Sequence, residues 1–192
     1  MQERHKQSGR RLIRPLVRLL SRAGVSPTAV TLAALPLSIA AAWLFAGGRF
    51  VWAGVALAAG GLCDSLDGEL SRLSGRQSDS GALLDSVVDR FCEAIVLAGI
   101  AWYYRAEPWY VMLAIAALVL SLMVSYVRAR AEGLGRECKV GLLERPIRVL
   151  ILLFGAVVLG RTWLPAALAV IVLGSAYTVG ERLVHVLRRG KG

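Results

Sequence analysis

The chain has 192 residues, 56% of them hydrophobic, and a mean hydropathy of +0.59, so it is more apolar than an ordinary soluble domain. The apolar residues fall in long runs separated by short polar stretches, and this pattern predicts an all-α polytopic membrane protein. The net charge of +10 would suit nucleic acid, but the basic residues cluster beside the apolar runs, where they can contact anionic lipid or substrate, so we exclude a nucleic-acid partner.

The N-terminal segment, residues 1–24, is basic and is predicted to contain an amphipathic helix. Leucine, isoleucine and valine recur at helical spacing over residues 9–24, and arginines occupy the other face. Such a helix is expected to lie in the membrane interface and to contact membrane lipids. Gly24 ends it, and we separate this segment from a membrane domain that covers residues 25–192.

Six apolar runs follow, and they predict six transmembrane helices. Ser26 is suited to cap the first of them, and Pro27 to occupy its first helical position. The fifth run is short, so we expect its cytoplasmic end to lie in a cavity. In chain order the predicted spans cover residues 28–47, 51–73, 81–103, 108–131, 146–160 and 163–187.

The distribution of lysine and arginine predicts the orientation of these spans. Of the 23 such residues, 20 lie near the N-terminus, in residues 72–90, in residues 128–148 or near the C-terminus. The other side has only Arg49, Arg105 and Arg161. By the positive-inside rule, both termini are expected in the cytoplasm of a cell membrane protein, as an even number of spans requires.

Four aspartates lie on, or just inside, the second and third spans. Asp64 and Asp67 are one helical turn apart on one face, and Asp85 and Asp89 share a face of the next helix. A short turn around Gly75 is expected to make the two helices antiparallel neighbours, so that both acidic faces converge. Because an unpaired charge in the bilayer is costly, intramembrane carboxylates predict a functional site, here at the cytoplasmic face.

Four converging carboxylates would repel one another unless cations neutralise them. Oxygen ligands without histidine or cysteine favour Mg²⁺, Mn²⁺ or Ca²⁺ over zinc. Two such ions would suit a displacement at phosphorus. Gly68 and Gly81 lie on the same faces as the acids and would admit a bulky ligand to the backbone, although helix packing through small residues is the alternative explanation.

Residues 64–89 read DSLDGELSRLSGRQSDSGALLDSVVD and resemble the signature of the CDP-alcohol phosphotransferases, also called phosphatidyltransferases, D-x-x-D-G-x-x-A-R-x(8)-G-x-x-x-D-x-x-x-D. One position departs, because Ser71 stands where the family usually has alanine. The six-span layout and the amphipathic start extend the resemblance over the whole chain. The matching residues are Asp64, Asp67, Gly68, Arg72, Gly81, Asp85 and Asp89.

This resemblance implies an enzyme that moves a substituted phosphoryl group from a CDP-linked donor to an alcohol and releases CMP. Lipid-synthesising members use CDP-diacylglycerol, and related proteins form homodimers, which we expect here by analogy. The resemblance also implies that the four aspartates bind two Mg²⁺ or Mn²⁺ ions that hold the diphosphate, and that Asp89 takes the proton of the acceptor hydroxyl. The predicted donor site contains Gly68, Ser71, Arg72, Gly81 and Thr31.

The acceptor is predicted from the connection between the fourth and fifth spans. The stretches S-Y-x-x-A-R-A-E and E-R-P, with G-V-S-P before the first span, resemble the phosphatidylinositol-phosphate synthase branch, whose acceptor is inositol 1-phosphate. Glycerol 3-phosphate, which phosphatidylglycerophosphate synthases use, is the alternative. Arginine forks suit a phosphate-bearing acceptor, although the positive-inside rule would also place basic residues here. The predicted acceptor-phosphate site contains Arg128, Arg130, Lys139, Arg145, Arg148 and Arg182.

Two functions other than catalysis are also compatible with parts of the sequence. An ion transporter would explain the four acids, but it would not explain the fixed glycines or Arg72. A basic membrane-surface adaptor would explain the N-terminal helix and the charge, but it would leave the aspartates without a role. The transferase accounts for all of these features.

Overall fold

The computed structural model describes residues 13–75 and 77–189, and these residues form helices and connections without any strand. The predicted all-α fold is therefore confirmed. The N-terminal amphipathic helix remains a prediction, because residues 1–12 lie outside the described residues; residues 13–22 are helical. The helices that follow are α2 (Pro27–Ala46), α3 (Phe50–Ser74), α4 (Asp79–Tyr103), α5 (Pro108–Gly133), α6 (Arg145–Phe154), the π-helical turn η1 (Gly155–Leu159) and α7 (Gly160–Arg189).

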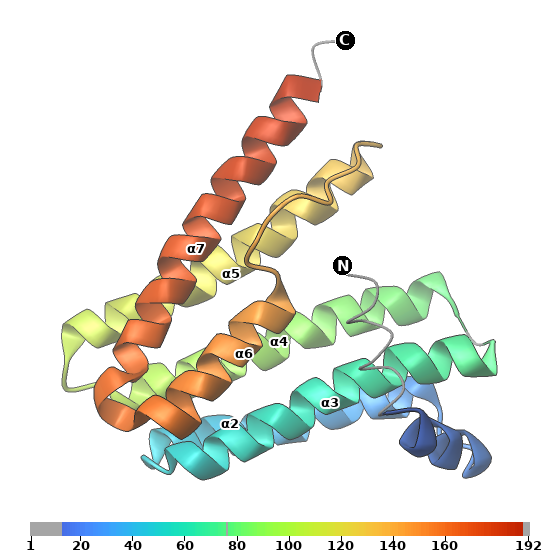
Figure 1. Cartoon of the computed structure of the whole chain (residues 1–192), viewed down its shortest axis with the longest axis horizontal. Helices are drawn as coiled ribbons and strands as arrows, with labels where there is room; N and C mark the ends of the chain where they lie inside the picture. The colour runs from blue at the N-terminus through green and yellow to red at the C-terminus, as the bar shows by residue number, and fades with distance from the viewer. Residues whose placement is uncertain (1–12, 76, 190–192) are drawn as a thin grey trace.

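Four helical stretches are long and apolar enough to cross a membrane: Pro27–Ala46, Phe50–Ser74, Pro108–Gly133 and Arg145–Arg188. The chain is therefore a multi-pass membrane protein, while the number of six spans remains a prediction. The predicted fifth span corresponds to α6 with η1, and the predicted sixth span corresponds to α7. The chain reverses between them at Gly160, which has a φ of 64° (Figure 1). The composition of α4 does not mark it as a span, because three charged residues, Asp89, Arg90 and Glu93, lie near its middle.

Local signals in the sequence set the ends of the helices around the aspartates. The Ser26 side chain caps α2 by accepting a hydrogen bond from the backbone N–H of Ala29 at 3.1 Å. The left-handed Gly75, with a φ of 64°, ends α3, and Ser78 caps α4 by accepting from the N–H of Gly81 at 3.1 Å. The predicted short turn between the two aspartate-bearing helices is thus present.

The helix α2 packs closely against both α3 and α4. Among the described residues, α3 and α4 make few close backbone contacts with each other, so the expectation that they pack as direct neighbours is not met. The close approach of α2 to α4 explains the difference. A Cβ atom added at Gly99 would lie 2.4 Å from the backbone oxygen of Ala42, so only glycine allows this contact.

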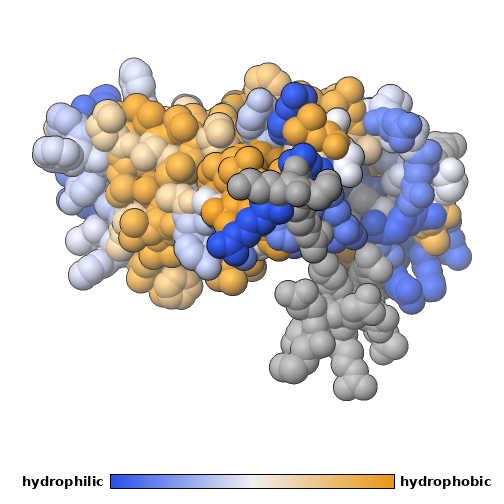
Figure 2. Space-filling model, turned by 90° about the horizontal axis from the view of Figure 1, so that it is seen from above, coloured by the Kyte–Doolittle hydropathy of each residue, from blue (hydrophilic) through white to orange (hydrophobic). Residues whose placement is uncertain are grey.

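The second group of helices is the packed pair α5 and α7, and α6 lies between this pair and α3 (Figure 1). In Figure 1 the pair diverges from α4 toward the end of the molecule where α3 and α4 are connected. Figure 2 shows an apolar band over the middle of the molecule and a strongly hydrophilic surface at that same end. The polar end and the apolar band are the pattern expected of a membrane protein.

The largest apolar core fills the opposite end of the molecule. There Phe45, Phe50 and Tyr103 pack edge to face, and Tyr104 continues the chain of rings. The Tyr104 hydroxyl donates a hydrogen bond to the backbone oxygen of Arg161 and so joins α4 to the start of α7. A cavity of about 560 Å³ opens at the surface of this end, and Tyr103, Tyr104 and Arg161 line it.

Candidate active site

Three aspartates from two helices form the centre of the site. Asp64 and Asp67 come from α3, and Asp85 comes from α4. One carboxylate oxygen of each lies within 4.8 Å of those of the other two. An oxygen cluster of this size fits a divalent cation such as Mg²⁺ or Mn²⁺.

The carboxylate of Asp67 is held in place from α2. The Thr31 hydroxyl lies 2.6 Å from Oδ2 of Asp67 and 3.2 Å from the backbone oxygen of Pro27. Both Thr31 and Asp67 are buried. Thr31 was predicted in the donor site, and the structure places it directly behind a carboxylate of the cluster, where it fixes the direction of the free oxygen.

Asp89 lies beside this cluster and contacts an arginine from α6. The Arg145 guanidinium is 2.6 Å from Oδ1 of Asp89 and 3.0 Å from Oδ1 of Asp64. This guanidinium therefore links α3, α4 and α6, and its positive charge offsets part of the repulsion among the carboxylates. The Nε atom of Arg145 is buried and has no hydrogen-bond partner among the described residues.

A cavity of about 510 Å³ opens beside the carboxylates. It begins at the N-terminal ends of α2 and α4, where Ser26 and Ser78 cap the helices. Helix N-termini favour phosphate groups because their backbone N–H groups carry partial positive charge. All five residues predicted for the donor site line this cavity: Thr31, Gly68, Ser71, Arg72 and Gly81.

The two glycines in the cavity wall are explained by access rather than by helix packing. A Cβ atom at Gly68 would meet only the Arg72 guanidinium, at 3.6 Å. A Cβ atom at Gly81 would lie 3.0 Å from the capping hydroxyl of Ser78. Neither position faces a neighbouring helix closely, so the small residues leave the cavity open.

The six basic residues predicted for the acceptor occupy two kinds of environment. Arg128, Arg130 and Lys139 are accessible; Arg128 pairs with Glu132 at 2.9 Å, and Lys139 pairs with Glu137. Arg145 faces the carboxylates, as described above.

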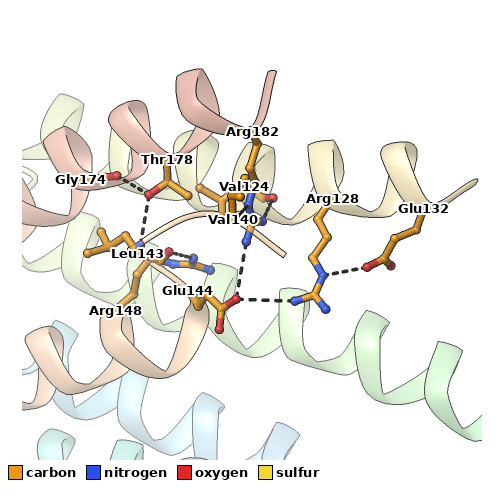
Figure 3. A network of polar contacts seen from close by, with 10 residues as sticks. All are labelled: Val124, Arg128, Glu132, Val140, Leu143, Glu144, Arg148, Gly174, Thr178 and Arg182. Atoms are coloured by element: carbon orange, nitrogen blue, oxygen red, sulfur yellow. Dashed lines mark hydrogen bonds and ion pairs between the residues drawn. The ribbon is translucent and has the colours of Figure 1, made fainter. Parts of the chain in front are cut away.

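Arg148 and Arg182, by contrast, are buried. Arg148 makes two hydrogen bonds to Glu93, of 2.7 and 2.9 Å. Arg182 donates to the backbone oxygens of Val124 and Val140, and it lies 3.7 Å from the Glu144 carboxylate (Figure 3). Glu93 was not among the residues predicted from the sequence, although its i+4 spacing from Asp89 places it on the acidic face of α4.

This fold and site define a class of protein, namely a multi-pass helical membrane protein with an oxygen-ligand site for divalent metal. A sequence model of the CDP-alcohol phosphatidyltransferase family matches residues 25–180. The phosphatidylinositol phosphate synthase of Mycobacteroides abscessus is 36% identical over 191 residues, which cover 95% of this chain and 86% of the relative.

Solved structures of the phosphatidylinositol phosphate synthase of Mycobacterium tuberculosis have the same fold. The crystal structure with CDP-DAG bound has a TM-score of 0.83 and 31% identity, and the match covers 92% of this chain and 94% of that one. The crystal structure in complex with manganese and citrate also has a TM-score of 0.83 and 31% identity, covering 90% and 88%.

The chain belongs to the CDP-alcohol phosphatidyltransferase family. The resemblance seen in the sequence is thereby confirmed, and the protein is a metal-dependent transferase of phospholipid synthesis.

Proposed function

We propose that this protein transfers the phosphatidyl group of CDP-diacylglycerol to a hydroxyl of inositol 1-phosphate, giving phosphatidylinositol phosphate and CMP. The observation that carries the proposal is the convergence of Asp64, Asp67 and Asp85 beside a cavity that begins at two helix N-termini. The donor and the product are supported by the relatives, since one is solved with CDP-DAG bound and another is named for phosphatidylinositol phosphate.

The metal site is proposed to hold two Mg²⁺ or Mn²⁺ ions, with Asp64, Asp67, Asp85 and Asp89 as ligands. The oxygens of the three clustered carboxylates are suitable ligands for one ion. Asp89 lies close enough to Asp64 for both to contact Arg145. When bound, the ions would offset the diphosphate charge and stabilise CMP as it leaves.

The chain's own residues are proposed to orient both substrates. The N-termini of α2 and α4 and the Arg72 guanidinium face the cavity and favour the diphosphate, and Gly68 and Gly81 admit the nucleotide. The acceptor oxygen forms a bond to the phosphorus that bears diacylglycerol, while the bond from that phosphorus to CMP breaks. Asp89 accepts the hydroxyl proton and acts by position as much as by basicity.

The acceptor phosphate is proposed to bind the basic residues on the far side of Asp89. A phosphomonoester carries about −1.5 to −2 charge at neutral pH and accepts paired bonds from guanidinium groups. The proposed group contains Arg128, Arg130, Lys139, Arg145, Arg148 and Arg182. The first four have accessible donors or face the site, whereas Arg148 and Arg182 are buried beneath them.

A panel assay tests this function. Purified protein, CDP-diacylglycerol and Mg²⁺ would be offered inositol 1-phosphate, free inositol, glycerol 3-phosphate and serine, and CMP release would be measured. We expect inositol 1-phosphate to be preferred, and we expect a chelator to abolish CMP release until Mg²⁺ or Mn²⁺ is restored. Preference for glycerol 3-phosphate would assign the protein to the alternative reaction, and ion flux in proteoliposomes without CMP release would refute the transferase.

We also propose that the protein works in the cell membrane as a homodimer, with its termini and active site in the cytoplasm. The concentration of basic residues and of hydrophilic surface at the site's end supports this orientation (Figure 2).

A further inference from the structure

Two cavities lie at the end of the molecule opposite the aspartates, and Arg105 lines both of them. This residue belongs to the short turn that joins α4 to α5 (Figure 1). One cavity is polar and opens among the helix ends, whereas the other is an apolar groove between α4 and α5. The proposed reaction uses neither of them.

The apolar cavity, which we call the α4–α5 groove, has a volume of about 390 Å³. The small side chains of Ala98, Ala101 and Ala114 line it and make room for it. Trp102 and Ile115 line it too and are exposed, so the groove is open to the surrounding lipid. It follows about two turns of each helix, or roughly 11 Å, which fits within the roughly 15 Å of hydrocarbon in one leaflet.

The polar cavity, of about 560 Å³, is built on a row of packed tyrosine rings. Tyr103, Tyr104 and Tyr110 pack edge to face in sequence, with ring centroids 4.9 and 5.2 Å apart. The Tyr104 hydroxyl donates to the backbone oxygen of Arg161, so the chain that carries this arginine is anchored at the cavity wall. Because Glu107 also lines the cavity, its wall contains two arginines and one acid.

These two arginines are explained neither by topology nor by ion pairing. The positive-inside rule leaves only Arg49, Arg105 and Arg161 at this end, yet two of the three line one cavity. Across the ranges that the structure describes, no carboxylate forms an ion pair with Arg105 or Arg161. Arg105 instead donates to the backbone oxygen of Trp102 at 3.2 Å, and its guanidinium lies 5.5 Å from the centre of that ring. A positive charge is thereby held where the groove meets the polar cavity.

Exposed tryptophans indicate that both cavities lie at the level of lipid head groups. Trp102, Trp109 and Trp163 are all exposed at this end. Tryptophan is enriched where a membrane protein crosses the boundary between hydrocarbon and water. A guanidinium at this level is well suited to a lipid phosphate, with which it forms paired hydrogen bonds.

We propose that the α4–α5 groove and the adjoining polar cavity together bind one phospholipid of the leaflet opposite the active site. An acyl chain lies in the groove, and the phosphodiester contacts Arg105 and Arg161. Glu107 accepts a hydrogen bond from a hydroxyl or amine of the head group. A second copy of the chain fits less well, because within the described residues this end carries three arginines and one acid, so two copies would repel each other here.

Lipid binding to the delipidated protein in detergent tests the site, with dioleoylphosphatidylglycerol as the probe and native mass spectrometry as the measurement. EDTA is present, so that the metal-dependent active site is not loaded. Arg105→Gln removes the charge, and Ala98→Phe fills the groove at an exposed position. We expect each change to raise the dissociation constant about tenfold, the smallest effect of losing one charged hydrogen bond.

Each variant has a matched control. Arg49 is also at this end and lies 6.0 Å from the centre of the Trp43 ring, but it lines neither cavity. Ala40 is exposed on α2, away from both cavities. We expect Arg49→Gln and Ala40→Phe to keep the dissociation constant within about twofold of the unaltered protein. Equal affinities in all five proteins, or equal losses in the two phenylalanine variants, would indicate unspecific lipid around the helices and would overturn the proposal.

Two competitors separate the chemical requirements of the site. Dioleoylglycerol lacks the phosphate and glycerol 3-phosphate lacks the acyl chains, so neither should displace the probe. Displacement by glycerol 3-phosphate would mean a site for free anions, displacement by dioleoylglycerol would mean a groove for any acyl chain, and either result would contradict the proposal. The same spectra report the oligomeric state. A loss of dimer in Ala98→Phe with unchanged lipid binding would show that a second copy occupies the groove, and the proposal would then be wrong.

Discussion

The aspartates of the site differ in their neighbours, and these differences separate their roles. Asp67 accepts a hydrogen bond from Thr31 and clusters with Asp64 and Asp85. Asp89 instead contacts the Arg145 guanidinium of α6. We predict that Asp89→Asn lowers turnover by roughly 10²- to 10⁴-fold, the range for loss of a general base, while the donor still binds. Single-turnover CMP release and equilibrium binding of CDP-diacylglycerol measure the two effects, and near-normal turnover would refute the assignment.

The hydroxyl behind Asp67 gives a prediction for metal affinity. Thr31→Val removes the 2.6 Å hydrogen bond but preserves the shape of the side chain, so Asp67 is less well oriented. We expect the Mg²⁺ concentration for half-maximal activity to rise about 10- to 100-fold, as for lost partners of metal ligands, with recovery at high Mg²⁺. Thr162→Val, at the exposed opposite end, is the control. An unchanged Mg²⁺ requirement would show that Thr31 does not act through the metal.

At the scale of the elements, α2 is the support on which the two aspartate helices are assembled. Gly99→Ala would place a Cβ atom 2.4 Å from the backbone oxygen of Ala42, which cannot move as a flexible side chain does. We predict a loss of about 1–3 kcal/mol in stability, as for overpacking of a core, seen as a lower Tm in detergent. The control Gly180→Ala has open space around the added atom and should hold or raise the Tm. Equal Tm values for the two variants would mean that α2 and α4 adjust freely.

Elements whose signals are local could be predicted from the sequence. The caps Ser26 and Ser78 and the left-handed Gly75 act within one turn of the helix ends that they define, so the bounds of α2, α3 and α4 were close to those expected. The motif likewise located the cluster and the residues that line the cavity.

Contacts between segments distant in the chain could not be predicted in this way. Nothing local distinguishes Arg145 from Arg148, three residues apart, yet one faces the carboxylates and the other is buried on Glu93. The partner of each depends on which side of α6 meets α4. The packing of α2 between α3 and α4 is equally non-local, because it requires the close approach at Gly99.

At the scale of the whole molecule, charge and polarity are distributed unequally between the two ends. The end with the aspartates is strongly hydrophilic and carries most of the basic residues, whereas the other end closes around packed aromatic rings (Figure 2). The charged head group of a CDP-linked lipid lies at the aqueous surface of the bilayer, so the proposed orientation requires the donor to lie in the cytoplasmic leaflet.

Cysteine labelling tests this orientation with two positions at opposite ends of α5. In a background lacking Cys63, Cys92 and Cys138, single cysteines would replace Arg105, just before the helix, and Arg130, near its last turn. The 26 residues of α5 span about 39 Å, enough to cross the bilayer, so the two positions lie on opposite sides. We expect an impermeant maleimide to label position 105 in intact cells and position 130 only after permeabilisation. The reverse pattern would place the active site outside the cell. It would contradict the orientation that we infer from the distribution of basic residues.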